Sequence, residues 1–502
     1  MPVDPTHPGI YVQEVPSGVR TIPGVSTSTA LFIGGCASGP LNMPIICRTY
    51  SDFTRKFSED ATSSNLARYV KLCFMNGGTT CYVMRIASGA LAATLQLRTG
   101  TGANSLLLTA KSVGLAGNDL RAAVSYDTDQ PEATFNVELF RWVLDSLGNR
   151  VKADTELWRN VSMDQTSATY APAFLSQNSL LVNASLASTP VASAALSQAP
   201  FQAAGTAGTD GSPPLASDYG DAYVVVDREI DLFNILVLPS ASGLNQQQLW
   251  GPASIFCKRR RAILLMDPPD AWTSAQEATT GVDALRIGLV KDHAALYFPR
   301  VTITENGLAV QLGPTGAIAG VMARIDTARG VWKAPAGTEA DIRGVVGLER
   351  RLSDLENRDI NARAINTLRA LPSSVVCWGA RTMDGNDSNA SDYKYVPVRR
   401  LALFMEESLY RGLKWVVFEP NDEALWAQIR LNVGAFMHGL FTQGAFQGAR
   451  TSDAYFVRCD AETTTQDDRN QGFVNIWVGF APLKPAEFVV LYLRQVAGTI
   501  NV

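Results

Sequence analysis

The sequence predicts an α/β protein whose body comes from two separate parts of the chain, with an inserted β-rich domain and extended terminal arms. Apolar strand patterns alternate with helical patterns over residues 25–89 and again over residues 221–493, which favours a sheet covered by helices. Residues 90–220, between these parts, carry short strand patterns separated by polar turns. Both ends, residues 1–24 and 494–502, lie outside any helix–strand unit.

Composition limits the classes of protein that fit. The chain has 502 residues, of which 46% are hydrophobic and 18% charged, with a formal net charge of −4. A chain of this length is expected to form two to four folding units with sizeable cores. The charge balance lacks the basic footprint of a nucleic-acid-binding protein. No apolar run is long enough to span a bilayer and the first residues do not resemble a secretory signal, so we expect cytosolic synthesis without membrane insertion.

The first arm and the first body segment are bounded by proline and glycine. Residues 9–16 form an extended stretch outside any domain, which must pair with a sheet edge somewhere, either in its own domain or elsewhere. Pro16, Gly18 and Pro23–Gly24 suit a hinge, although an ordinary ordered loop fits as well. Residues 25–89 predict strands at 29–33 and 81–86, helices at 51–57 and 65–75, and a helix-ending turn at 76–78.

The inserted part differs in character from the body. Strand patterns occur at 95–98, 106–109 and 135–142, and residues 184–218 form an Ala/Ser/Thr/Gly/Pro-rich tract typical of a loop or linker. We expect the insertion to leave the body after the strand at 81–86 and to rejoin it at a strand at 222–226.

The second body segment divides into a middle part, 221–335, and a C-terminal part, 336–493. Its predicted strands are 222–226, 235–239, 262–266, 294–303, 375–383, 415–419, 455–459, 473–478 and 488–493. Its predicted helices are 245–261, 274–289, 352–371, 398–410 and a long helix, capped by Asn421 or Asp422, that runs to about Leu440.

Patterns that carry catalysis are missing, and we predict no catalytic, cofactor-binding or metal-binding residues. The chain has three histidines and no HExxH, GxSxG, GxGxxG or GxxxxGK[ST] sequence. Gly34–Gly39 follows a strand, but Pro40 comes next, so a turn is favoured over a phosphate loop. Asp267 and Asp270 could form an acid–base pair, yet the intervening prolines favour a strand-ending turn. His293 is expected to be packed or capping.

The seven cysteines are too sparse for a disulfide scaffold. Most are expected to be small buried residues. An exposed one could cross-link subunits if the protein leaves the reducing cytosol.

Seven stretches, in order, resemble the contractile tail sheath family of phage tails and related injection machines. They are PGIYVQEVPSGVRTIPGVSTS at 8–28, NGGTTCYVMR at 76–85, GAIAGVMARIDTARGVWKAP at 316–335, WGARTM at 378–383, VRR at 398–400, FEPND at 418–422 and APLKPAEF at 481–488. Gly337 stands where the family usually has Asn. The resemblance covers residues 1–89 and about 225–495, and residues 90–220 have no clear counterpart, as is usual for the family's outward-facing variable domain.

The resemblance implies a structural protein without a cofactor, which stacks as hexameric rings around an inner tail tube and contracts to drive the tube through a host envelope. Its partners would be other copies of itself, the tube protein, and baseplate and tail terminator proteins. It would be assembled in the host cytoplasm and become part of the virion tail. The arms would add strands to sheets of neighbouring subunits. The residues expected in these strands are Ile10, Tyr11, Val12, Gln13, Val15, Val489, Leu491, Leu493 and Val496.

The family places the C-terminal part against the tube, and candidate tube-facing residues are Gln428, Arg430 and Gln443. A solvated helix face or a contact between sheath subunits fits these residues equally. Two other functions stay open at this point: the sheath of a phage-derived bacteriocin or extracellular injection particle and, more remotely, a nucleotide-binding α/β enzyme.

Overall fold

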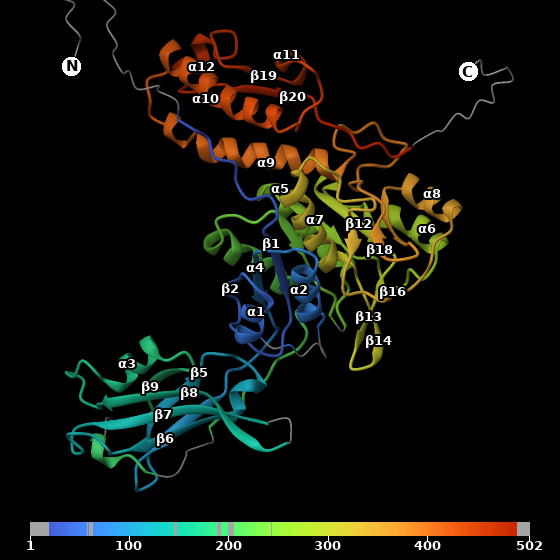
Figure 1. Ribbon diagram of the computed structural model, residues 1–502. Coiled ribbons are helices and arrows are strands. Elements are labelled where there is room, and N and C mark those ends of the chain that lie inside the picture. Colours follow the sequence, from blue (N-terminus) through green and yellow to red (C-terminus); the bar gives the residue numbers. More distant parts are fainter. Residues whose placement is uncertain are drawn as a thin grey trace, which may run out of the picture. The chain divides into compact units, whose positions relative to one another are not determined.

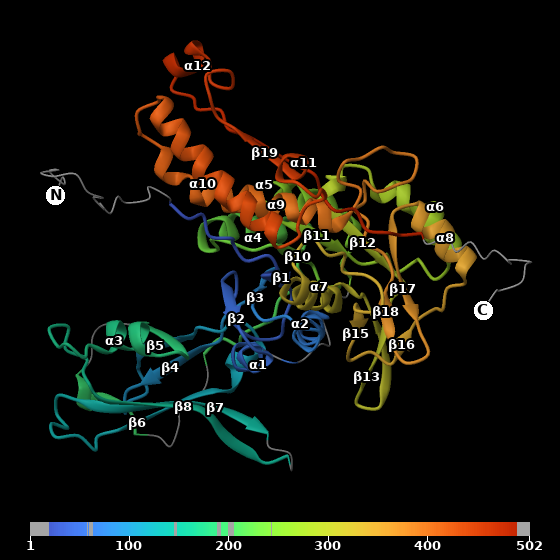
Figure 2. The ribbon, with the colours of Figure 1, turned by 45° about the horizontal axis from the view of Figure 1, so that its top comes forward.

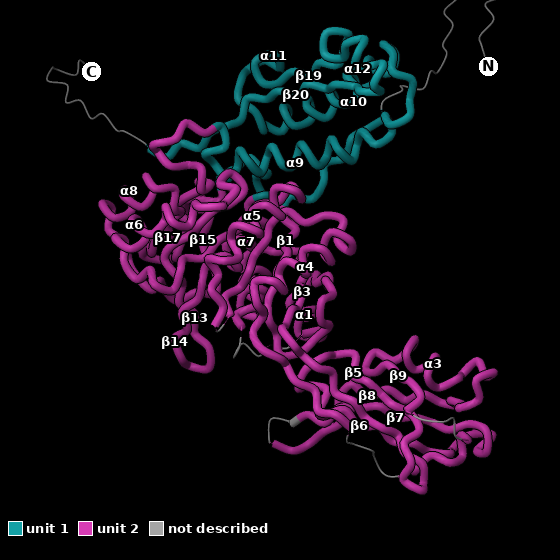
Figure 3. The backbone as a smooth tube through the Cα atoms, turned by 180° about the vertical axis from the view of Figure 1, so that it is seen from behind, with its two compact units in different colours: residues 1–27, 326–334, 392–502 teal, residues 28–325, 335–391 magenta. Residues whose placement is uncertain are grey.

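The computed structural model describes residues 20–57, 59, 64–144, 148–187, 192–198, 205–241 and 243–488 (Figure 1). The chain divides into two compact units (Figure 3). Unit 1 comprises residues 1–27, 326–334 and 392–502, and unit 2 comprises residues 28–325 and 335–391.

Unit 2 is built on a nine-stranded mixed sheet. Six neighbouring strands in its centre are parallel, and the outer strands β2, β18 and β15 are antiparallel to their neighbours. The order across the sheet is β15 (Asp341–Ile342), β18 (Val375–Cys377), β17 (Ile365–Ala370), β12 (Ala294–Phe298), β11 (Ile263–Met266), β10 (Ile235–Val237), β1 (Ala30–Gly34), β3 (Cys81–Arg85) and β2 (Pro44–Cys47).

Helices cover both faces of this sheet, which explains why its central strands are apolar throughout. One buried cluster joins alternate strand residues such as Leu31 and Leu264 to helices α4 (Ala216–Glu229), α5 (Gln247–Arg259), α6 (Ala275–Leu285) and α8 (Asp354–Ala362). The intervening strand residues, such as Phe32, are equally buried but outside that cluster. Helices α2 (Leu66–Met75) and α7 (Thr315–Arg329) also belong to this unit (Figure 1). The short helix α1 (Tyr50–Lys56) precedes α2.

Helices α2 and α7 cross so closely that only glycine fits on α7. A Cβ added to Gly316 would lie 2.7 Å from the Cα of Tyr69, and one added to Gly320 would lie 2.2 Å from the carbonyl oxygen of Cys73. These distances are shorter than any ordinary contact, so the glycines of the 316–335 stretch set the separation of the two helices.

Residues 94–186 form two antiparallel three-stranded sheets that share one buried apolar cluster. The first sheet contains β4 (Thr94–Arg98), β5 (Asn104–Ala110) and β9 (Val182–Leu186); the second contains β6 (Leu120–Ser125), β7 (Phe135–Leu144) and β8 (Arg150–Val161). A short helix, α3 (Ala171–Asn178), accompanies them. A further small sheet, made of β14 (Leu308–Leu312), β13 (Val301–Glu305) and β16 (Gly347–Leu348), belongs to the same unit.

The chain segments that lead into and out of this β-rich part run side by side. Ser88 bridges Ser212 and Leu91 bridges Thr209, each antiparallel. The buried Arg85, the last residue of β3, donates from Nη1 to the carbonyl oxygens of Gly39 (2.9 Å) and Val113. These two segments therefore lie next to each other, and an inserted domain with boundaries at 90 and 220 stays a prediction.

Unit 1 contains two long helices and a strand pair. Helices α9 (Val396–Gly412) and α10 (Glu423–Thr442) contribute most of its buried cluster. The other elements are α11 (Thr451–Ala454), β19 (Tyr455–Arg458), α12 (Gln466–Asn470) and β20 (Trp477–Phe480). Figure 2 shows α10 running beside β19. Asp422 caps α10 as predicted, because its carboxylate accepts a 2.9 Å hydrogen bond from the Leu425 amide.

The α/β class is confirmed, but several elements differ from prediction. The predicted strand at 222–226 lies inside helix α4. Its buried side chains, Tyr219, Ala222, Tyr223 and Val226, follow helical spacing. The run Val224–Val226 favours a strand by local propensity, but packing against α5 and the sheet overrides it.

The predicted helix at 352–371 is half helix and half strand. Helix α8 ends at Ala362, Ala364 adopts a positive φ of 59°, and the chain then enters strand β17. Apolar residues at 360, 365 and 368 fit a helical stripe, yet they belong to two elements packed on one another.

Two further strands are shorter or absent. Residues 415–419, predicted as a strand, contain a 3₁₀ turn, Lys414–Val416, and Phe418 with a φ of 71°. The strand predicted at 473–478 overlaps β20 (Trp477–Phe480) only at residues 477–478, and residues 473–476 are not in a strand. The strand predicted at 294–303 is divided at Pro299 into β12 and β13, which join different sheets.

Candidate assembly site

The segment Arg20–Thr27 is anchored along the helices of unit 1. The Arg20 amide donates to Asn432 Oδ1 (2.8 Å), the Val25 amide donates to Ser408 Oγ (3.2 Å), and Arg400 donates to the Thr27 carbonyl (2.9 Å). Residues 20–27 are therefore held to unit 1 by side-chain and backbone contacts with α9 and α10.

The same anchor includes Pro23–Gly24, which the sequence offered as a hinge. A Cβ on Gly24 would lie 2.9 Å from Cζ of Phe404, and Ile22 is buried against Gly412. The Arg20 guanidinium lies 4.5 Å from the centre of the Trp415 ring, a cation–π contact. Hinging at residues 23–24 would break this packing, whereas Pro16 and Gly18 lie outside the described residues.

The strands β19 and β20 form a two-stranded sheet. Tyr455 pairs with Phe480 and Arg458 with Trp477, antiparallel and in continuous register. Within the described residues, neither strand joins a further strand of the sheet, apart from the Phe446–Pro482 bridge just beyond β20. Backbone groups along the outer edges are therefore available for strand addition.

The two faces of this sheet differ. Tyr455, Val457, Val478 and Phe480 pack against the buried cluster of unit 1. On the other face Phe456 is 51% exposed and Trp477 is 56% exposed. Other large apolar side chains of unit 1 are also exposed: Val417, Phe418, Leu431, Phe473, Leu483 and Phe488.

The predicted arm residues cannot be located. Ile10, Tyr11, Val12, Gln13 and Val15 lie outside the described residues, as do Val489, Leu491, Leu493 and Val496.

The three tube-facing candidates all lie on α10 or at its end, but they differ in environment. Gln428 is exposed on the helix, and Gln443 is exposed at its C-terminal cap. Arg430 is half-buried, because its guanidinium bonds Glu423 Oε1 (2.6 Å) and the Cys459 carbonyl oxygen. Arg430 thus has a structural role inside unit 1. Its contact with a tube stays a prediction.

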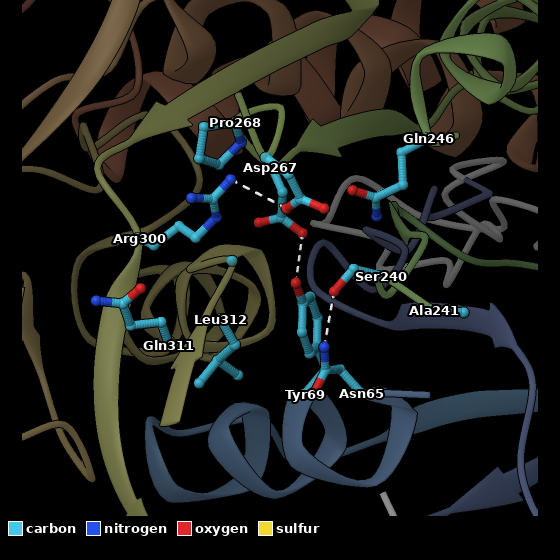
Figure 4. Close-up of a pocket in the computed structure, with 12 residues that line it drawn as sticks. Asn65, Tyr69, Ser240, Ala241, Gln246, Asp267, Pro268, Arg300, Gln311 and Leu312 are labelled. Carbon is cyan, nitrogen blue, oxygen red and sulfur yellow. Dashed lines mark hydrogen bonds and ion pairs between the residues drawn. The ribbon is translucent and has the colours of Figure 1, made fainter. Parts of the chain in front are cut away.

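A cavity of about 230 Å³ lies at the carboxyl ends of the parallel strands of unit 2, where α/β enzymes bind their ligands (Figure 4). Asp267, the residue after β11, is among those that line it. Tyr69 donates to Asp267 Oδ2 (2.7 Å), and Thr315 donates from its amide to Oδ1 (3.1 Å) and from its hydroxyl to Oδ2 (2.9 Å). Burial raises the pKa of Asp267 to about 6, although these bonds oppose the shift.

This arrangement is structural rather than catalytic. Asp267 joins β11 to α2 and to the start of α7, and a Cβ on Gly313 would collide with its carboxyl at 2.1 Å. Asp270, the predicted partner, instead pairs with Arg300 (3.0 Å). His293 is buried in a short 3₁₀ turn, 2.9 Å from the Asp292 carboxylate, as expected for a packed residue.

The described part of the chain contains no group of three or more His, Cys, Asp or Glu side chains arranged to bind a metal ion. Among its helices, none combines the length and apolar character needed to cross a bilayer.

Within the described residues, unit 1 thus presents the outer edges of β19 and β20, with Phe456 and Trp477 exposed on one face of the pair. Residues 216–383 match the family model of the phage tail sheath protein central domain, and residues 388–496 match that of the phage tail sheath C-terminal domain. Together these matches span more than half of the chain, which therefore belongs to the contractile tail sheath family. Its role is structural, and it is not an enzyme.

Solved structures show the same fold. The anti-feeding prophage helical sheath in its contracted state is 21% identical, covers 98% of this chain and 100% of its own, and has a TM-score of 0.59. The sheath complex of the extracellular contractile injection system PVC, also contracted, is 19% identical over 98% of this chain and 99% of its own, with a TM-score of 0.59. The sheath tail protein of Listeria innocua is 15% identical over 92% and 96%, with a TM-score of 0.61. A search of curated proteins found no match.

Proposed function

We propose that this chain polymerises as stacked hexameric rings around an inner tail tube, and that contraction of the polymer drives the tube through a host envelope. The observation that carries the proposal is the β19–β20 sheet, which no third strand joins within the described part of residues 20–488, in the same unit that anchors residues 20–27. A sheet of two strands is marginal alone and gains from added strands.

The arms supply those strands in this proposal. Residues 10–15 of one neighbour and residues 489–496 of another add to the outer edges of β19 and β20. Backbone pairing depends little on side chains, and each net hydrogen bond contributes about 0.5–1.5 kcal/mol. Several bonds per strand, repeated in every subunit, would hold the lattice together while the subunits rearrange.

The anchor at residues 20–27 supports an arm that stays attached to its own subunit while its first residues pair with a neighbour. Packed contacts such as those of Ile22 and Gly24 would bear any force on the arm. The exchanged part is then residues 1–19.

The exposed face of α10 is the proposed tube contact, with Gln428 and Gln443 on it. The polar Gln428 and Gln443 suit an interface that must break during contraction. The partners are the tube protein and the baseplate and terminator proteins at the two ends. The sheath assembles in the cytoplasm of the producing cell.

The particle is a phage tail or a related injection particle. The inserted β-rich part favours a phage virion if smaller particles have smaller sheath proteins. However, the anti-feeding prophage sheath matches 98% of this chain over its full length. Chain length therefore does not separate the two readings, and both remain proposals.

Deletion of residues 1–19 tests the arm exchange. The truncated chain keeps Arg20 and its contacts, so its melting temperature should match that of the full chain, while electron microscopy should show no long hollow polymers. The matched control is Ile10→Val with Val12→Ile, which keeps the strand pattern and should polymerise normally. Normal tubes from the truncated chain would contradict arm exchange.

A further inference from the structure

Two cysteines face each other across the edge of the nine-stranded sheet. Cys47 ends β2 and Cys81 begins β3, and the two are direct partners in the antiparallel register. Partner residues in antiparallel strands have Cα atoms about 4.5–5.5 Å apart, with side chains on the same face. This separation lies inside the range of about 4.4–6.8 Å that disulfides span.

The remaining cysteines lack such a partner in register, and all seven are buried as free thiols. Burial removes the exposed cysteine that cross-linking between subunits would require. Cys73, on α2, is the one other thiol close enough to influence Cys81 electrostatically. It is therefore the natural competitor for a bond to Cys81.

The thiol pair is already polarised. A hydrogen bond from Cys81, and more weakly the charge of Lys56, lowers the pKa of Cys47, while burial opposes the shift. The same hydrogen bond, together with burial, raises the pKa of Cys81. Thiolate character therefore concentrates on Cys47, the sulfur that a peroxide would oxidise first.

Position in the fold gives an oxidant a route. Among the strands that the structure describes, β2 is the last of the sheet and pairs with β3 alone. The residue after Cys47 is the exposed Arg48. Edge strands open locally more readily than central ones, so a molecule as small as hydrogen peroxide can reach the pair without unfolding the unit.

We infer that Cys47 and Cys81 are an oxidation site that forms an intrachain disulfide between β2 and β3 when the protein meets a peroxide. The Cys47 thiolate attacks one peroxide oxygen, the O–O bond breaks, and the released hydroxide takes a proton to become water. The Cys81 sulfur then attacks the Cys47 sulfenic acid, the S–O bond breaks, and the departing hydroxide takes the Cys81 proton. Overall, two thiols and one hydrogen peroxide give one disulfide and two water molecules.

The bond would tie the edge strand to the sheet and close a loop containing α1 and α2. In a sheath assembled in a reducing cytosol, it would form only after release. That timing rests on the proposed function, whereas the bond itself does not.

The test uses the reduced full-length chain, treated with a small excess of hydrogen peroxide and then blocked with N-ethylmaleimide. Digestion without reductant and mass spectrometry should find a peptide joining Cys47 to Cys81. After denaturation, five thiols should react, two fewer than the seven of the reduced chain. Seven reactive thiols, or a bond joining Cys73 to Cys81, would overturn the inference.

Variants sharpen the result. Cys47→Ala should abolish the linked peptide, whereas the matched control Cys257→Ala, another buried thiol, should keep it. Oxidation should raise the thermal midpoint of the wild type and of Cys257→Ala but not that of Cys47→Ala. If Cys47→Ala fails to fold, the wild-type peptide map alone decides. Loss of tube formation with the disulfide intact would count against the proposed function and not against the oxidation site.

Discussion

Removing one partner of the buried ion pair between Arg400 and Asp326 should destabilise unit 1 strongly. The guanidinium of Arg400, on α9, binds both carboxylate oxygens of Asp326, at 2.9 and 2.6 Å. Both side chains are only 3% exposed, and Arg400 also donates to the Thr27 carbonyl. Asp326→Ala would leave a buried guanidinium without its counter-charge.

The magnitude follows from that burial. Breaking a buried pair by removing one partner costs about 3–5 kcal/mol, because the remaining charge keeps its desolvation penalty. In a unit of this size that corresponds to a fall in melting temperature of roughly 6 to 20 °C. Replacing both partners, as Arg400→Met with Asp326→Leu, should cost much less than the two single changes combined.

Calorimetry of the single and double variants measures these differences, since it resolves the transitions of separate units. Arg358→Met is the matched control, because the Arg358–Asp359 pair is exposed and should contribute less than about 1 kcal/mol. Additive losses, or a single-variant loss no larger than that of Arg358→Met, would refute the reasoning. Arg400→Met should additionally increase proteolysis near Thr27, whereas a variant that only weakens the core would not act there first.

Three further predictions concern unit 2, α10 and pH. The pKa of Asp267 is raised from 3.8 to about 6, so its protonated form stabilises the fold below pH 4, and this contribution of about 3 kcal/mol is lost as the pH rises to about 6. In urea unfolding, the free energy of unfolding of the wild type should fall over this pH range, whereas that of Asp267→Asn should not. An equal fall in both proteins would contradict the assignment. Gly320→Ala should destabilise by about 1–3 kcal/mol through collision with Cys73, whereas Gly434→Ala, in open space on α10, should be neutral or stabilising in the same denaturation assay. Gln428→Glu should weaken co-sedimentation with tubes without changing the melting temperature. Arg430→Glu should lower the melting temperature, because the new carboxylate would face Glu423. Equal melting temperatures for the two variants would contradict the contacts of Arg430.

Local patterns predicted the elements whose signals do not depend on distant partners. The capped helix that begins after Asp422 and the apolar strands at 29–33 and 262–266 are examples. In these elements the apolar residues of the pattern are the ones that the fold buries, and the charged and turn residues mark the ends. The helix at 216–229 was missed because its β-branched residues carry the opposite local preference, and only contact with α5 and the sheet decides it.

Some functional features are visible in the sequence and others only in the structure. The ordered motifs, from the 8–28 stretch to the 481–488 stretch, were sufficient to identify the family, and the missing phosphate loop argued against nucleotide chemistry. The anchor of residues 20–27 had no detectable signal, because Arg20 and Asn432 are 412 positions apart. Nothing near either residue specifies the other.

The sequence by itself therefore determined the class of protein, the cap of α10 and central strands such as β1 and β11, since these follow from neighbouring residues and from motifs in order along the chain. Tertiary structure alone decided the strand order, in which β10 lies beside β1 and β2 takes the edge. It also decided the Arg400–Asp326 pair and the facing thiols of Cys47 and Cys81. The physical reason is that pairing across a sheet or between helices depends on which surfaces become buried together, and periodicity within one segment carries no information about its partner.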